Sequence, residues 1–155
     1  MISRYSRKEI KKIWEPANKF KVWLDIEIAI CEALENKGII PKKALKNIRN
    51  NSSFNVDRID QIEKEVKHDV IAFLTNLSEN IGEDSRFIHQ GVTSSDILDT
   101  TLSIQLKESC KIIKKELKKL LDVLKEKAIS YKRTPCIGRS HGIYAEPTTF
   151  GLKML

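Results

Sequence analysis

This sequence has few cysteines and no long apolar run. The three cysteines (Cys31, Cys110 and Cys136) are odd in number, far apart and without metal-ligand spacing, so we expect neither a disulfide framework nor a cysteine zinc site. Free thiols are typical of a reducing compartment, and we expect a cytoplasmic location. No apolar run approaches the roughly 20 residues that cross a bilayer. Residues 1–6 lack the apolar core of a signal peptide, so we expect no membrane association.

Aromatic residues are also scarce, at 6% of the chain, although the formal net charge is +7. Much of the positive excess lies in residues 107–133, where Tyr131 is the one aromatic residue. A nucleic-acid surface usually combines basic residues with aromatic stacking residues or a reading motif. We therefore interpret these lysines as a solvated helix face and expect no nucleic-acid partner.

Glycine and proline are absent from residues 92–133, where apolar residues recur at spacings of three, four and seven. This pattern predicts one helix of about 36 residues, roughly 54 Å long at the usual rise per residue. A helix of that length exceeds the needs of a compact domain of 155 residues, so we expect it to belong to a helical bundle or coiled coil. Thr93 and Asp96 suit its N-terminus, and Pro135 suits its end.

Helical periodicity also dominates the preceding residues. The pattern predicts a short helix that begins at a Ser6–Glu9 capping box, and a final helix that begins near Pro147. Further helices are expected over residues 18–37, 41–50 and 55–81, the last of them broken at His68–Asp69, with an irregular link over residues 83–91. We predict an all-α fold: an N-terminal helical domain (1–92), then the first long helix of a truncated helical bundle (93–155).

The chain has three histidines, and histidine is the side chain whose ordinary pKa lies nearest neutral pH. His141 lies between Ser140 and Gly142, and a glycine neighbour allows close approach to a substrate and proton exchange with it. The carboxylate of Asp69 could orient His68, although such a histidine is more often a capping residue. His89 is interpreted as a packed or loop histidine. No two histidines have helical metal-ligand spacing, so we expect no metal site.

Two further segments could bind anions. The backbone N–H groups of Thr93-Ser94-Ser95, at a helix start, could hold a carboxylate or phosphate. Arg4 could grip a phosphate with two hydrogen bonds.

Together, these segments resemble the adenylosuccinate lyase family of the fumarase/aspartase/argininosuccinate lyase superfamily. The matching stretches, in order, are Arg4-Tyr5-Ser6, His68-Asp69-Val70, Gly91 to Asp96 with Asp99-Thr100, and Gly138 to Lys153. The resemblance implies a carbon–nitrogen lyase that releases fumarate from adenylosuccinate by β-elimination to give AMP. It also implies action on the succinyl-carboxamide ribotide of purine biosynthesis, with no metal or organic cofactor.

By position, the resemblance implies that His141 is the general acid and that His68 is its neighbour in the same pocket, with Asp69 orienting His68. The residues that it implies for substrate binding are Thr93 and Ser94 (carboxylate), Arg4 and Tyr5 (nucleotide phosphate), and Lys67, which stands where many relatives have Asn. Tyr144 stands where relatives often have His.

The family's Ser-Ser-x-Met-Pro-x-Lys-x-Asn loop, the source of the catalytic base, lies beyond Leu155, and family sites combine three subunits of a homotetramer. We therefore expect the chain to be inactive alone. One alternative is another fumarate-releasing lyase of the superfamily, of the argininosuccinate, aspartate, malate or carboxymuconate type. A second is a non-catalytic module, in which the long basic helix serves self-association or nucleic-acid binding.

Overall fold

The computed structural model describes residues 2–155, apart from the side chain of Ser3. The chain forms two compact units, Met1–Ser109 and Cys110–Leu155, and each is described by itself. The predicted domain boundary between residues 92 and 93 stays a prediction.

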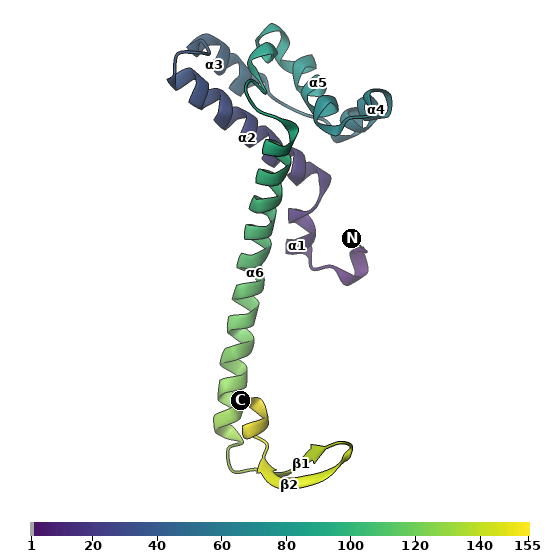
Figure 1. Ribbon diagram of the computed structural model, residues 1–155, viewed down its shortest axis with the longest axis vertical. Coiled ribbons are helices and arrows are strands. Elements are labelled where there is room, and N and C mark those ends of the chain that lie inside the picture. The colour runs from purple at the N-terminus through teal and green to yellow at the C-terminus, as the bar shows by residue number, and fades with distance from the viewer. Residues whose placement is uncertain (1) are drawn as a thin grey trace. The chain divides into compact units, whose positions relative to one another are not determined.

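Helices make up the first unit (Figure 1). In chain order they are the 3₁₀ helix η1 (Ser3–Tyr5), α1 (Lys8–Ile13), α2 (Pro16–Asn36), α3 (Lys42–Asn51), α4 (Val56–Val66), α5 (Asp69–Ile81), the 3₁₀ helix η2 (Gly82–Phe87) and the start of α6 (Ser94–Ser130). The predicted all-α class is confirmed, with one small two-stranded sheet in the second unit. Among the described residues, no helix has an apolar stretch long enough to cross a membrane.

Local caps set several helix ends. Asn55 accepts a hydrogen bond from the Arg58 N–H (2.9 Å) at the start of α4, as its residue type favours. The predicted break at His68 is confirmed, because Lys67 ends α4 in the left-handed region (φ 56°) and His68 caps α5. The prediction of a capping box at Ser6 was wrong, since the Ser6 hydroxyl donates to the Ile2 carbonyl (2.8 Å) and makes no capping bond to α1.

The core of the first unit is built around an aromatic cluster. The ring of Phe73 stacks on that of Phe20 at 5.7 Å and meets the edge of Trp23 at 5.4 Å. All three side chains are buried, and such pairs add to the stabilisation from apolar burial. Ile97, fully buried in the same cluster, fixes the first turns of α6 against this core.

The second unit departs from the predicted final helix. Strands β1 (Pro135–Ser140) and β2 (Ile143–Thr149) pair antiparallel, with Pro147 opposite Ile137. The prediction of a helix from Pro147 was therefore wrong. Within residues 2–155, neither strand has a second neighbour, and a free strand edge tolerates proline. The threonines at the end of β2 favour extended backbone.

Gly151 joins the hairpin to the end of α6. Its N–H donates to the Tyr131 carbonyl (2.9 Å), and the Phe150 ring packs on the Tyr131 ring at 5.3 Å. A Cβ atom at this position would lie 2.4 Å from the Ala128 carbonyl oxygen. Only glycine allows this approach, because backbone atoms cannot move aside as a flexible side chain would.

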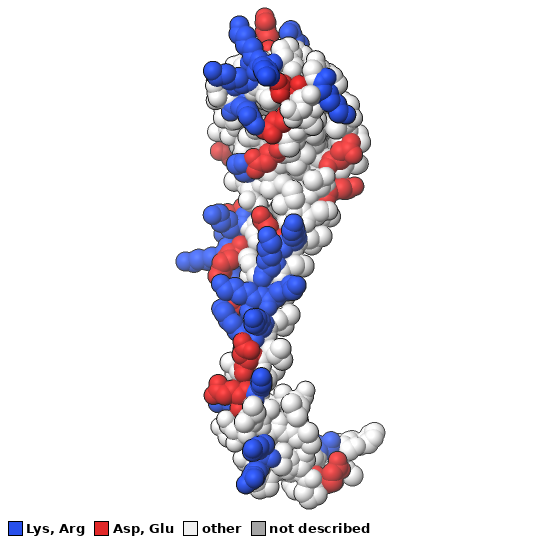
Figure 2. All heavy atoms as spheres, turned by 90° about the vertical axis from the view of Figure 1, so that its left-hand side faces the viewer, with Lys and Arg blue, Asp and Glu red and all other residues white. Residues whose placement is uncertain are grey.

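Helix α6 has 37 residues, which confirms the predicted long helix. Basic side chains gather along it (Figure 2), and apolar side chains also remain exposed on it. These exposed apolar residues are Leu102, Leu106, Ile113, Leu117, Leu120, Leu121, Val123 and Ile129. Five of them, Leu102, Leu106, Ile113, Leu117 and Leu120, recur at spacings of three, four and seven residues. They form an exposed apolar stripe of the kind that packs in helical bundles.

Candidate functional site

The turn between α4 and α5 carries Lys67, His68 and Asp69. His68 Nδ1 accepts a hydrogen bond from the Ile71 N–H (3.4 Å) and lies 3.6 Å from Asp69 Oδ1. Asp69 also accepts from the Val70 N–H (2.7 Å). Because Nδ1 is the acceptor, the neutral ring carries its hydrogen on Nε2. The exposed imidazole is therefore oriented by its own helix cap, with Nε2 available for proton exchange.

The start of α6 carries the predicted carboxylate-binding pair, Thr93 and Ser94. The Thr93 N–H donates to Asp96 Oδ2 (2.8 Å), which is the backward half of a capping box. Since Asp96 occupies that N–H, the hydroxyl of the exposed Thr93 is the group that remains to hydrogen-bond an anion. Ser94 is the first residue of α6, where backbone N–H groups and the helix dipole favour an anion.

Arg4 and Tyr5 are both exposed, Tyr5 by 75%. The Arg4 guanidinium carbon lies 4.8 Å from the centre of the Tyr5 ring, a cation–π contact. This contact uses the face of the guanidinium and leaves its N–H groups available for a phosphate.

His141 lies in the second unit, at the tip of the β1–β2 hairpin. Ser140 pairs with Ile143, so His141 and Gly142 alone form the turn. Both have positive φ (51° and 79°), as a type I′ turn requires. A left-handed conformation is uncommon for a residue with a side chain, and here it places the exposed imidazole at the end of a two-stranded arm.

The structure thus places the predicted residues in both units. The first unit holds Arg4, Tyr5, Lys67, His68, Asp69, Thr93 and Ser94, and the second unit holds His141. Over residues 2–155, no group of three or more His, Cys, Asp or Glu side chains has the geometry of a metal site.

A buried pair, Glu27 and His89, was not predicted. Glu27 Oε2 accepts the His89 backbone N–H (3.0 Å), and Oε1 lies 2.6 Å from His89 Nδ1. Burial raises the pKa of the Glu27 carboxyl, and the bonds to His89 act in the opposite direction. One signal was available: Glu27 stands four residues from Trp23 and from Cys31, on an apolar stripe where an acidic residue needs a partner.

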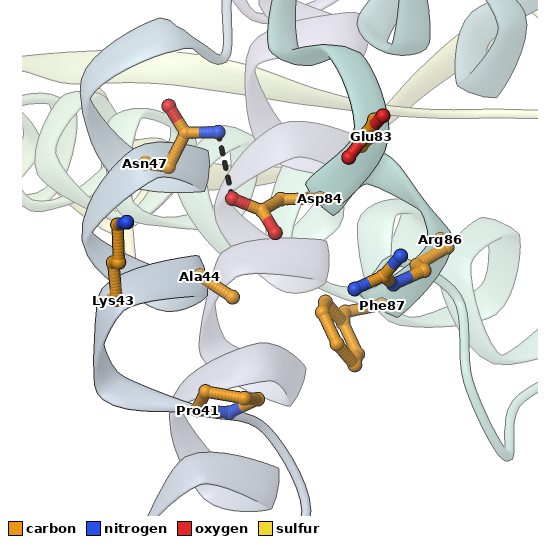
Figure 3. Close-up of a pocket in the computed structure, with 8 residues that line it drawn as sticks. All are labelled: Pro41, Lys43, Ala44, Asn47, Glu83, Asp84, Arg86 and Phe87. Atoms are coloured by element: carbon orange, nitrogen blue, oxygen red, sulfur yellow. Dashed lines mark hydrogen bonds between the residues drawn. The ribbon is translucent and has the colours of Figure 1, made fainter.

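A cleft of about 450 Å³ lies between α3 and η2 (Figure 3). It contains none of the predicted site residues. Its lining residues are Pro41, Lys43, Ala44, Asn47, Glu83, Asp84, Arg86 and Phe87. Asp84 accepts a hydrogen bond from the Asn47 amide (2.9 Å). Two basic and two acidic side chains offset each other, so the cleft favours neither an anionic nor a cationic ligand.

The chain is similar in sequence to known proteins. A family model described as "Lyase" matches residues 4–155. The chain is 49% identical over 154 residues to an adenylosuccinate lyase of Bacillus subtilis, and 48% identical over the same length to one of Staphylococcus saprophyticus. Each match covers 99% of this chain and 36% of the relative, so the chain spans about a third of the length of these relatives.

Solved structures also match. A fumarate lyase from Mesorhizobium sp. BNC1 has a TM-score of 0.88 and 25% identity, over 97% of this chain and 37% of that one. A 3-carboxy-cis,cis-muconate lactonizing enzyme from Pseudomonas putida has a TM-score of 0.90 and 26% identity, over 98% of this chain and 36% of that one.

Proposed function

Because the chain belongs to the lyase family whose model matches residues 4–155, we propose that it is part of an adenylosuccinate lyase. The complete protein would cleave the C–N bond of adenylosuccinate by β-elimination, giving fumarate and AMP, and would treat the succinyl-carboxamide ribotide in the same way. The observation that carries this proposal is the identity of 49% over 154 residues to an adenylosuccinate lyase. The structural relatives with other names are less similar, at 25% and 26%.

The reaction needs an acid that protonates the departing nitrogen and a base that removes the β-proton. We assign the acid to His141, whose imidazole is exposed on a defined turn. His68 is its proposed neighbour in the assembled site, and the bond from Ile71 N–H supports this role because it orients the imidazole. Asp69 lies beside that ring. The base would come from a part of the protein outside this chain.

The remaining residues bind the anionic groups of the substrate in this proposal. Thr93 and Ser94 would hold a carboxylate at the positive end of α6, and Arg4 and Tyr5 would close over the phosphate. Lys67 would contribute through its backbone. The left-handed conformation of Lys67 (φ 56°) ends α4 at this residue and turns the peptide away from the helix. The backbone groups of Lys67 would therefore be accessible to the substrate.

We also infer a homotetramer, with no nucleic-acid partner and a cytoplasmic location. The exposed apolar stripe of α6 supports self-association, because large apolar patches rarely face water in a stable monomer. Four copies of α6 would bury these stripes in a helical bundle. The three free cysteines suit a reducing compartment.

The oligomer can be tested with one substitution on the stripe. In the complete protein, Leu117→Lys places a charge where a neighbouring helix would pack, and sedimentation should then show species smaller than the tetramer. Lys118→Ala, at the next position along the exposed surface, should leave the sedimentation unchanged. A tetramer that survives Leu117→Lys would contradict a bundle built on this face.

Fumarate release tests the activity. The complete protein should release fumarate from adenylosuccinate, whereas the 155-residue chain alone should release none. Argininosuccinate, aspartate and malate, which release fumarate when they are cleaved, form the comparison panel together with carboxymuconate, whose consumption is followed directly. Preferred turnover of one of these compounds would replace the proposed substrate. Turnover by the 155-residue chain alone would contradict the proposal that the catalytic base lies outside this chain. Binding with a steep salt dependence but no turnover would favour the non-catalytic module.

A further inference from the structure

The buried pair of Glu27 and His89 links two distant parts of the first unit. The Glu27 side chain lies on α2 and is 1% exposed, and both of its oxygens are directed at His89, 62 residues along the chain. A buried carboxylate is tolerated when hydrogen bonds satisfy it. Because both of these bonds come from one residue, they fix the backbone and the ring of His89 together.

The backbone of His89 needs such support. Its φ is 64°, a left-handed conformation that residues with a side chain adopt rarely and that persists where the surroundings hold it. One turn further along α2, the Cys31 thiol lies 3.7 Å from the Phe87 carbonyl and donates to it. Helix α2 therefore holds the turn over residues 87–89 at two points, the Phe87 carbonyl and His89.

The held turn leads directly into the start of α6. Gln90, Gly91 (φ 74°) and Val92 separate His89 from Thr93. On the far side, Ile97 is fully buried in the core. Thr93 and Ser94 thus lie between two anchors, Ile97 on their own helix and the Glu27–His89 pair before it.

We propose that Glu27 is a positioning residue that, by accepting both hydrogen bonds from His89, sets where Thr93 and Ser94 meet the substrate carboxylate. This inference rests on the proposed function, in which these two residues bind that carboxylate. A carboxylate can only accept, so His89 Nδ1 carries a hydrogen and Nε2 is the ring atom left outside the pair. The bonds from His89 lower the pKa of Glu27, against the larger effect of burial, which raises it.

Two variants of the complete protein remove the Glu27–His89 contact in part or in full. Glu27→Gln keeps the shape and one acceptor oxygen, and Glu27→Met keeps the chain length but removes both acceptors. We expect Glu27→Gln to raise the KM for adenylosuccinate about 10-fold and Glu27→Met to raise it further, by analogy with the roughly 10–100-fold losses when residues that orient metal ligands are replaced. The Kd of fumarate should rise in the same order.

The matched control is Glu32→Gln, on the same helix. Glu32 pairs with Arg49 at the surface and is not bonded to His89, so its loss should leave the KM unchanged. A purely structural role for Glu27 would lower the Tm and leave the KM and the fumarate Kd of the folded enzyme at their normal values. That result would overturn the proposal.

Hydrogen exchange, followed by mass spectrometry on the complete protein, gives a readout that needs no activity. The His89 amide should exchange slowly in the unmodified protein and faster in Glu27→Met, because its acceptor is gone. Unchanged exchange would overturn the inference. If the unmodified protein released no fumarate, the proposed function would fail, and the exchange rates would still decide whether Glu27 holds the turn.

Discussion

Replacing His141 with Asn in the complete protein is expected to lower the kcat for fumarate release by about 100-fold or more, the usual contribution of a general acid or base. Asparagine tolerates the left-handed backbone better than most residues do, and His141 has φ 51°. The hairpin turn should therefore survive while the proton donor is lost. The kcat, measured with saturating adenylosuccinate, reports the loss.

The control lies on the same hairpin. Tyr144→Phe removes a hydroxyl from an 80% exposed side chain and should leave the kcat within about twofold of the original, since surface substitutions have small effects. A kcat that His141→Asn does not change, in protein with unaltered circular dichroism, would exclude His141 as the acid. The site would then depend on His68 or on residues outside this chain.

Phe73→Ala is expected to have the largest effect on stability. Its ring is fully buried and contacts both Phe20 and Trp23, so truncation removes apolar burial and leaves a cavity. We expect the free energy of unfolding to fall by about 3–5 kcal/mol. Urea titration of the 155-residue chain, followed by tryptophan fluorescence, measures this, because Trp23 lies against the altered position.

Ile71→Ala is the matched control on α5. The Ile71 side chain is 46% exposed, and its N–H, which donates to His68, is unaffected by the substitution. The midpoint of its urea transition should stay near that of the unmodified chain. Similar losses in the two variants would mean that the aromatic cluster does not dominate the stability of this unit.

Local features of the chain made several elements predictable. The absence of glycine and proline predicted α6, and the range predicted over residues 55–81 agrees with the start of α4 and the end of α5. The break before Asp69 was predictable because polar residues interrupt an apolar run there. Each of these signals acts within a few residues, where capping and periodicity dominate.

The errors arose where a competing hydrogen bond or strand partner outside the predicted element decides the conformation. Ser6 has the residue type of a helix cap, yet its hydroxyl bonds to the Ile2 carbonyl instead. The segment around Pro147 forms a strand because residues 135–139 lie opposite it. The His141-Gly142 turn lacks the Asn-Gly or Asp-Gly sequence that usually announces such a hairpin.

The sequence by itself determined the all-α class, the long sixth helix and the residue types available for proton transfer, because periodicity, capping and side-chain chemistry are local properties. Tertiary structure alone decided that Glu27 pairs with His89, that β1 and β2 form an arm with His141 at its tip, and that Gly151 packs on the end of α6. These contacts join residues far apart in the chain, or require a fit between surfaces, and neither condition leaves a regular pattern in the sequence.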